Sequence, residues 1–380
     1  MIPIYILQFA CHLIKPTTVT LQPKPRHPSK PKQMQLIKTL VRTLTPSKAV
    51  TAATIAGLAT ALAQPVAMAS DNTLNIYSAR HYPTDDALYS GFTAATGIQI
   101  NRVDANDAGI LARLRAEGRN SPADVILLVD ATRLWRAEQD GLFANVKSAT
   151  LDSAIPAAVK GAPDANGASA WFGFSSRARI VVFDKARFDA ADVATYAQLA
   201  APKLKGALCL RSGSHPYNLS LFGAYLKHEG ESKTKAWLAG LVDNMARQPK
   251  GGDTDQIRAV AAGECGVAVT NSYYLARLMR SDKPEDKAVV EKIGISLPDQ
   301  SGNGTHVNIA GGAVAKNAKN KANAIAFLDY LATPAAQAHF ANGNNEWPLA
   351  KGASANNPAL AAMAPKGFKA DSLPIRDIGS

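Results

Sequence analysis

The chain has 380 residues, of which 47% are hydrophobic, so it is long enough to bury two separate cores. Its formal net charge is +12, but residues 1–69 hold eight Lys and Arg and neither Asp nor Glu, and the remainder carries 34 basic and 30 acidic residues. This nearly balanced remainder, without a dense basic run between aromatic residues, argues against a nucleic-acid-binding protein.

The first 69 residues have the composition of an export signal rather than of a folded domain. Residues 34–48 are basic, residues 49–63 are apolar and small, and Ala67-Met68-Ala69 follows with small residues at the positions that leader peptidase reads. We therefore predict a signal peptide over 34–69, cleavage after Ala69 and a periplasmic mature protein. Residues 1–33 are interpreted as an upstream extension of a start at Met34; an anchored N-terminus using residues 2–14 is the alternative.

Strand and helix patterns alternate from residue 70 onward, which predicts an α/β lobe. Strands are expected at 73–79 and 99–103, and the run ADVILLV at 123–129 is continuously apolar, as parallel strands covered on both faces are. Helices are expected from about residue 85, at 109–117 and at 132–139, with Asp85 and Asp86 in the first turn of the first.

A long extended segment, WFGFSSRARIVVFDK at 171–185, predicts a strand that crosses into a second lobe. This lobe has strand–helix units of its own, the first of them a strand over ALCLR at 207–211 followed by a helix at 219–229. A return near residues 302–315 predicts a second crossing, and two crossings imply a hinge and a cleft. We assign 70–173 and 305–350 to the first lobe and 174–304 to the second, and leave the lobe of the tail 351–380 open. The predicted fold is α/β and two-lobed.

Cysteine usage agrees with export. Cleavage after Ala69 removes Cys11 and leaves Cys209 and Cys265, each in or beside an apolar strand pattern. A pair of cysteines in an exported protein favours a disulfide. Two buried free thiols are the alternative.

Four tyrosines lie where predicted strands pass into predicted helices: Tyr82 beside His81, Tyr217, and the neighbours Tyr273 and Tyr274. Ligands of open α/β sheets bind at such junctions. Phenolate is a hard anionic donor, so several of them suit a small, highly charged cation such as Fe³⁺. One such Tyr is usually a packing residue, but three equivalent junctions favour a metal site.

Two further side chains bear on this predicted site. Arg277 lies one helical turn after Tyr274, where its charge could offset that of a fourth phenolate from outside the ligand set. His215, two residues before Tyr217, is a rival ligand, and His81 could instead cap a helix or contact solvent.

Several segments resemble the periplasmic ferric-ion-binding proteins of bacterial ABC importers: ARHYPTD at 79–85, RSGSHPYNLSL at 211–221, CGVAVTNSYYLARL at 265–278, the stretch 304–331 and FANGNNEWP at 340–348. The resemblance spans nearly all of residues 72–350 and includes the spacing between Tyr217 and Tyr273. It implies a hinged, two-lobed solute-binding protein of type II, a monomer that hands Fe³⁺ to an ABC permease and its ATPase.

The resemblance also implies a ligand set of Tyr82, Tyr217, Tyr273 and Tyr274, with His81 at the position of the family's variable histidine. The chain is similar to the subgroup that uses more tyrosines and no carboxylate, because Asp130 is displaced by one residue from the expected position. Whether a small anion accompanies the iron is left open.

Two other classes of protein were weighed. A solute-binding protein for thiamine, a polyamine or an oxyanion would share the fold. A secreted hydrolase is disfavoured, because the sequence contains no G-x-S-x-G or H-E-x-x-H motif and no plausible pair of catalytic carboxylates. We therefore predict a binding protein and not an enzyme.

Overall fold

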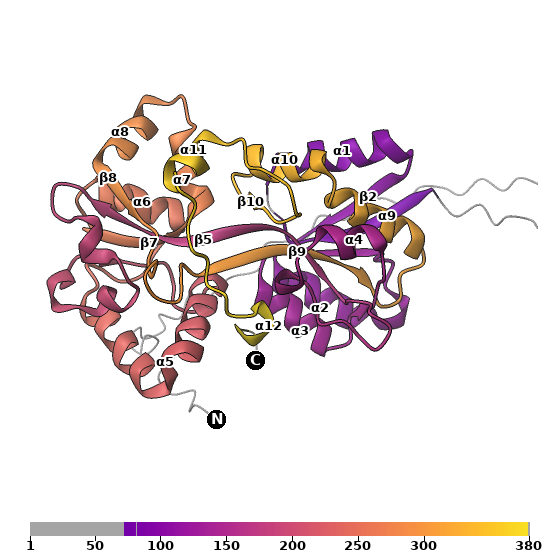
Figure 1. Cartoon of the computed structure of the whole chain (residues 1–380), viewed down its shortest axis with the longest axis horizontal. Helices are drawn as coiled ribbons and strands as arrows, with labels where there is room; N and C mark the ends of the chain where they lie inside the picture. The colour runs from indigo at the N-terminus through magenta and orange to yellow at the C-terminus, as the bar shows by residue number, and fades with distance from the viewer. Residues whose placement is uncertain (1–71, 81, 379–380) are drawn as a thin grey trace, which may run out of the picture. The chain divides into compact units, whose positions relative to one another are not determined.

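The computed structural model describes residues 72–80 and 82–378. The predicted signal region 1–69 and the candidate ligand His81 lie outside these residues. The described chain forms two α/β lobes, seen at the right and the left of Figure 1. No helix of the described part combines the length and the apolar character that a membrane crossing needs.

The first lobe is built on a mixed sheet in the order β2-β1-β3-β9-β5. β1 pairs in parallel with β2 and β3, while β9 runs antiparallel to both β3 and β5. The strands of this sheet are β1 (Thr73–Ser78), β2 (Gln99–Asp104), β3 (Val125–Leu128), β4 (Phe143–Ala144), β9 (Val307–Ala315), β10 (Trp347–Pro348) and part of β5 (Phe172–Asp184).

Helices cover both faces of this sheet and bury one hydrophobic core on each. Phe92 and Phe327 lie in one core and Ile126 and Leu134 in the other. The helices are α1 (Asp85–Thr96), α2 (Asp107–Glu117), α3 (Ala131–Gln139), α4 (Ala149–Ala154), α9 (Lys321–Leu331) and α10 (Pro334–Asn342).

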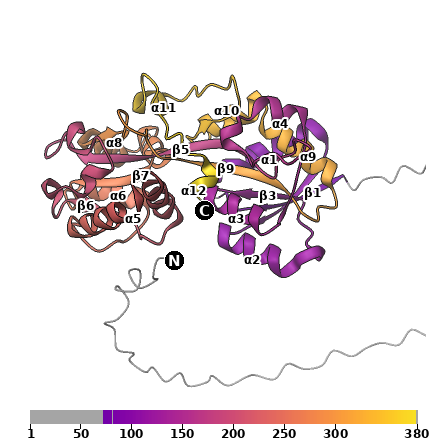
Figure 2. The ribbon, with the colours of Figure 1, turned by 60° about the horizontal axis from the view of Figure 1, so that its bottom comes forward.

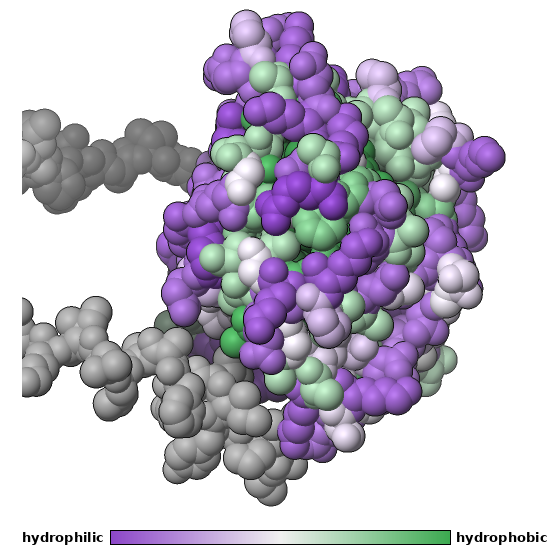
Figure 3. Space-filling model, turned by 90° about the vertical axis from the view of Figure 1, so that its left-hand side faces the viewer, coloured by the Kyte–Doolittle hydropathy of each residue, from purple (hydrophilic) through white to green (hydrophobic). Residues whose placement is uncertain are grey.

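The second lobe repeats this layered plan on a smaller sheet, with cores around Ile257 and Leu275 on one face and Trp237 and Val269 on the other. Its outer face is mainly hydrophilic, with smaller hydrophobic areas between polar ones (Figure 3). Its strands are β6 (Leu208–Cys209), β7 (Val267–Asn271), β8 (Ile293–Ser296) and the rest of β5. Its helices are α5 (Pro216–Asp243), α6 (Asp253–Ala261), α7 (Ser272–Met279) and α8 (Pro284–Lys292).

The strand β5 belongs to both sheets. Its residues 172–178 pair with β9, and its residues 179–183 pair with β7. The predicted crossing strand is thus present, and β9 is the return strand. The chain passes between lobes within β5, near residues 178–179; the residue-level division into lobes remains a prediction.

The tail, which the sequence left unassigned, contacts both lobes. α11 (Pro358–Met363) packs into the core of the second lobe beside α7. α12 (Ile375–Ile378) contacts α3 of the first lobe and α5 of the second, and Figure 2 shows it beside the C-terminus between the two groups of helices.

The observed elements differ from the predicted ones mainly in length. The helix expected at 219–229 runs from Pro216 to Asp243, with a break at Gly230, whose φ of 80° is non-helical. The strand expected over ALCLR is only Leu208–Cys209. As a result Tyr217 lies inside the first turn of α5, and Tyr273 and Tyr274 lie in the first turn of α7.

Candidate metal site

The four candidate tyrosines come from three helix starts. Tyr82 lies between β1 and α1, Tyr217 is the second residue of α5, and Tyr273 and Tyr274 follow Ser272 at the start of α7. Pro216 opens α5, where its missing N–H is no loss. The Nδ1 of His215, the N-cap residue, accepts a hydrogen bond from the backbone N–H of Tyr217 at 3.3 Å.

The structure brings the four phenol rings together. The hydroxyls of Tyr217 and Tyr273 are 3.2 Å apart. The rings of Tyr82 and Tyr273 meet edge to face with centroids 5.6 Å apart, and those of Tyr273 and Tyr274 have centroids 4.2 Å apart. Tyr82 and Tyr217 are 8% exposed and Tyr273 is 1% exposed, while Tyr274 is half-buried. These phenols form one cluster drawn from both lobes.

A cavity of about 830 Å³ opens beside this cluster. Tyr82, Tyr217 and Tyr274 line it, and Tyr273 lies behind them. The first lobe contributes the starts of α1, α2 and α3 to the wall, and the second lobe contributes Arg211, His215 and Pro216. The predicted cleft between the lobes is therefore present, and three of the four tyrosines line it.

Tyr82, Tyr217 and Tyr273 are protonated at neutral pH when no cation is bound. Burial, followed by the nearby charge of Glu346, raises the pKa of Tyr82 well above its usual value. Burial, then the neighbouring Tyr82 and Tyr217, raises the pKa of Tyr273 in the same way, and burial raises the pKa of Tyr217. A buried phenolate can form at these positions only when a nearby positive charge, such as that of a bound cation, stabilises it.

Buried charges surround the cluster, and the sequence patterns did not identify them. Arg80 forms an ion pair with Asp85 at 2.6 Å and lies 3.7 Å from Glu346, whose Oε1 accepts a 2.9 Å hydrogen bond from the hydroxyl of Tyr82. Arg177, 2% exposed, donates to the backbone carbonyl of Val129, and its guanidinium lies 5.6 Å from the ring centroid of Tyr217.

A second buried network holds the loops that carry the second-lobe tyrosines. Asp253, fully buried at the start of α6, accepts hydrogen bonds from Arg179 at 2.6 Å and Arg211 at 3.1 Å. It also accepts one from the backbone N–H of Asn271, the N-cap residue of α7, at 2.7 Å. One carboxylate thus fixes the crossing strand, the loop before α5 and the start of α7.

The remaining predicted residues are placed as follows. Arg277 is exposed, and its guanidinium lies 5.6 Å from the ring centroid of Tyr274. His215 lines the cleft but its Nδ1 serves as the helix cap, and burial followed by the charge of Arg211 lowers its pKa to about 4. Asp130 caps α3 and accepts a hydrogen bond from Asn308, so it has structural partners.

The donor set fits a hard, highly charged cation. Among the described residues, no group of three or more His, Cys, Asp or Glu side chains could hold a metal ion. The tyrosine cluster supplies only oxygen donors, which become anionic as they lose their protons. Such a set suits Fe³⁺ better than it suits softer metals.

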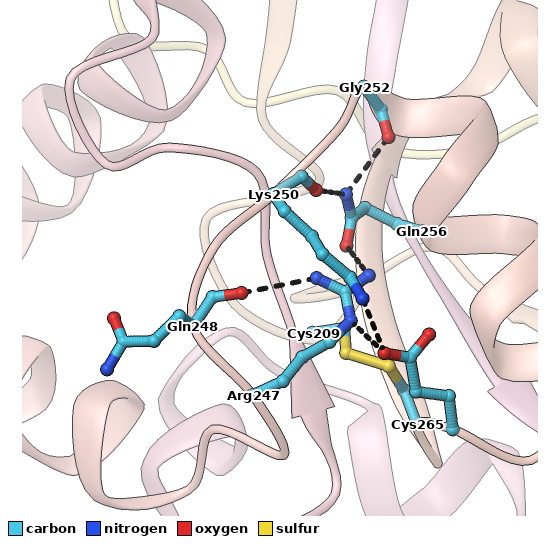
Figure 4. The surroundings of a disulfide bond; sticks show 8 residues. Cys209, Arg247, Gln248, Lys250, Gly252, Gln256 and Cys265 are labelled. Carbon is cyan, nitrogen blue, oxygen red and sulfur yellow. Dashed lines mark hydrogen bonds and ion pairs between the residues drawn. A yellow bond between two sulfur atoms is a disulfide. The ribbon is translucent and has the colours of Figure 1, made fainter.

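The predicted disulfide is present. Cys209 at the end of β6 and Cys265 before β7 are bonded, with Cα atoms 5.9 Å apart and both residues fully buried (Figure 4). Close to the bridge, Glu264 forms ion pairs with Arg247 at 2.8 Å and with Lys250 at 3.0 Å. The bridge joins the two strands that lead toward Tyr217 and Tyr273.

Comparison with known proteins agrees with this geometry. The chain is 45% identical over 315 residues to iron uptake protein A2 of Synechocystis, covering 82% of this chain and 87% of that protein. The solved structure of the Trichodesmium protein IdiA (FutA) with iron and citrate ligands superposes with a TM-score of 0.74 at 45% identity, covering 81% of this chain and 95% of that one.

The ferric binding protein of Campylobacter jejuni superposes with a TM-score of 0.75 at 36% identity, over 80% of this chain and 95% of that chain. Residues 87–370, more than half of the chain, match the family model described as bacterial extracellular solute-binding protein. The solved structures confirm the predicted two-lobed binding fold, and the similarity to the iron uptake proteins confirms the prediction of a binding protein rather than an enzyme. The chain belongs to the bacterial extracellular solute-binding protein family.

Proposed function

We propose that this protein binds Fe³⁺ in the cleft between its lobes and delivers it to an ABC-type importer. The observation that carries the proposal is the cluster of Tyr82, Tyr217, Tyr273 and Tyr274 beside the cleft. The named functions of the similar proteins, iron uptake and ferric binding, support the same ion.

The charges around the cluster fit a tetraphenolate iron site. Fe³⁺ with four phenolates carries one negative charge. Of the two buried arginines, Arg80 is paired with Asp85 and Glu346, whereas the guanidinium of Arg177 lies 5.6 Å from the ring centroid of Tyr217. Arg177 can offset this charge from inside the protein, and the exposed Arg277, whose guanidinium lies against the ring of Tyr274, can do so from outside. His81, next to Tyr82, remains a candidate additional ligand.

Three of the four phenols belong to the second lobe, so we propose that this lobe forms a nearly complete half-site. Closure about β5 and β9 then brings Tyr82 onto the ion and excludes water, and the ion selects the closed state because only that state offers all ligands. A membrane permease would recognise the closed form of the protein. A small anion could occupy the rest of the cleft, since 830 Å³ greatly exceeds the space that one ion needs.

The proposed location is the periplasm, with the protein acting as a monomer. The family description as extracellular agrees with export. N-terminal sequencing of the exported protein should give Ser70-Asp71 as its first residues. A mature protein that retains residues 34–60 would contradict the predicted cleavage.

Optical spectroscopy tests the proposed function directly. Protein loaded with ferric citrate should show a visible phenolate-to-iron charge-transfer band, and reduction should bleach it because Fe²⁺ suits phenolate poorly. The double variant Tyr273→Phe/Tyr274→Phe should lose the band. Tyr89→Phe is the matched control, because Tyr89 also lines the cleft but its hydroxyl faces Ser78. Wild-type protein without a band would refute iron binding by these tyrosines.

A further inference from the structure

Arg280 connects the two lobes at the end of the helix that carries two of the proposed ligands. α7 spans only eight residues and begins with Ser272-Tyr273-Tyr274. Immediately after it, the Nη1 of Arg280 donates one hydrogen bond to the carbonyl of Asn342, the last residue of α10 in the first lobe, and another to the Oδ1 of Asn345 at 2.7 Å. The start of this short helix therefore carries two proposed ligands of the second lobe, and the residue after its end is hydrogen-bonded to the first lobe.

Asn345 has a backbone conformation that needs support. Its φ is 59°, in the left-handed region that non-glycine residues rarely adopt, and the residue is only 6% exposed. Its side-chain oxygen accepts hydrogen bonds from Arg280 and, at 2.9 Å, from the Nδ2 of Asn357. The two donors fix this side chain and with it the direction in which the backbone enters the next residue.

That next residue is Glu346, which holds a proposed iron ligand. Glu346 is 1% exposed and accepts hydrogen bonds from the hydroxyl of Tyr82 at 2.9 Å and from the Oγ of Ser175 at 2.7 Å. Because Glu346 has so little free space, a shift of the Asn345 backbone moves the carboxyl group that lies against the Tyr82 oxygen, which donates a hydrogen bond to it until iron binding removes the phenol proton. A chain of contacts therefore runs from Arg280 through Asn345 and Glu346 to Tyr82.

We propose that Arg280 is a positioning residue, which sets the place of Tyr82 relative to Tyr273 and Tyr274 when the lobes are closed. This inference rests on the proposed function. Its partners are a neutral carbonyl and a neutral amide, each bound by a charged donor. Both bonds come from the two N–H groups of Nη1, whose directions the planar guanidinium fixes as a fork, whereas the N–H groups of a Lys ammonium rotate freely about its stem.

Four variants test the inference. Arg280→Ala removes the donor, Arg280→Lys keeps the charge without the fork, and Asn345→Gly keeps the left-handed backbone without the acceptor. Arg258→Ala is the matched control, because Arg258 also lies in the second lobe but its partner, Asp286, belongs to α8. Each protein is loaded with ferric citrate, and the charge-transfer band and the rate of iron loss to a strong chelator are measured.

Arg280→Ala and Asn345→Gly should release iron faster than wild type by up to about 10-fold, the lower end of the range for a lost outer partner of a metal ligand, because each acts on Tyr82 through Glu346, and both should shift the band. The rate of iron release from Arg280→Lys should lie between the rates of these two variants and that of wild type. Arg258→Ala should release iron at the wild-type rate. Combining Arg280→Ala with Asn345→Gly should add little, since both break the same contact.

Arg280→Ala with the band and release rate of wild type would overturn the inference while leaving the proposed function intact. Equal acceleration in Arg258→Ala would also overturn it, because the effect would then follow from lost positive charge in general. If Arg280→Ala does not fold, Asn345→Gly carries the same comparison. A wild-type protein without a charge-transfer band would instead refute the proposed function itself.

Discussion

The hydroxyl oxygens of Tyr217 and Tyr273 lie 3.2 Å apart, although the two residues are separated by 56 positions in the sequence. Each hydroxyl belongs to the first turn of a different helix, α5 or α7, and both are buried. Two phenolates at this distance would repel strongly, so only a shared cation allows both to ionise.

Tyr217→Phe should therefore weaken Fe³⁺ binding while leaving the fold unchanged. Loss of a direct ligand should lower affinity by more than about 100-fold, since even an outer partner of a ligand typically accounts for 10–100-fold. The measurement is competition against a chelator of known affinity. Tyr225→Phe is the control, because Tyr225 lies on the same helix but stacks on Trp237. Equal affinities for Tyr217→Phe and wild type would remove Tyr217 from the ligand set.

Iron retention should fall steeply as pH falls. The pKa values of Tyr82, Tyr217 and Tyr273 are all raised, so these phenols are protonated in the iron-free protein and lose their protons on binding. If all four tyrosines ionise, the apparent binding constant drops by up to about 10⁴-fold per pH unit. The slope of the logarithm of the binding constant against pH should be smaller by one in Tyr217→Phe than in wild type, because one proton fewer is released. This difference should not depend on the chelator. An unchanged slope would show that Tyr217 stays protonated.

The disulfide should contribute about 4 kcal/mol to the free energy of unfolding, as the chain-entropy model gives for cysteines 56 positions apart. Urea unfolding of iron-free protein should show this difference between wild type and Cys209→Ser/Cys265→Ser. The double variant should also release iron faster, because the bridge joins the strands that lead to Tyr217 and Tyr273. Free-thiol titration of denatured, unreduced protein should find no thiol; two thiols per chain would contradict the bridge in the exported protein.

His306 should make the protein sensitive to acid. Burial, then the charges of Arg179 and Arg177, lowers its pKa to about 3, and its Nε2 contacts the Oγ of Ser220 at 3.1 Å. An unfolded His titrates near pH 6.5, so the stability that neutral His306 provides is complete above about pH 6.5 and is lost between there and pH 3. Iron-free His306→Gln should lose less stability over this range in urea unfolding. Parallel curves for the two proteins would contradict this role.

Local sequence patterns were enough to predict where the tyrosines lie. Tyr82, Tyr217 and the Tyr273-Tyr274 pair each follow an apolar strand pattern and precede a helix pattern. The parallel strands β6 and β7 bring Tyr217 and Tyr273 to one edge of one sheet, whereas Tyr82 follows β1 of the other sheet. The disulfide followed from the number of cysteines and from the export signal. These inferences needed only neighbours along the chain.

The charged surroundings of the site could not be predicted in this way. Arg177 and Arg179 lie in a strand pattern that looks like any other, and only the packing of both lobes shows that both are buried. Glu346 contacts Tyr82 across 264 positions, and no local pattern links them. The alternation of charge and apolar residue in RARIVV does show, in retrospect, that two arginines share one face of a buried strand.

The double membership of β5 has a thermodynamic consequence. Twelve of its thirteen residues are buried, and its two halves are inner strands of different sheets. If one lobe unfolded alone, half of this strand would lose its partners while the other half stayed folded, leaving unpaired peptide groups at the boundary. The two lobes can rotate about this shared strand, but they are expected to melt as one cooperative unit.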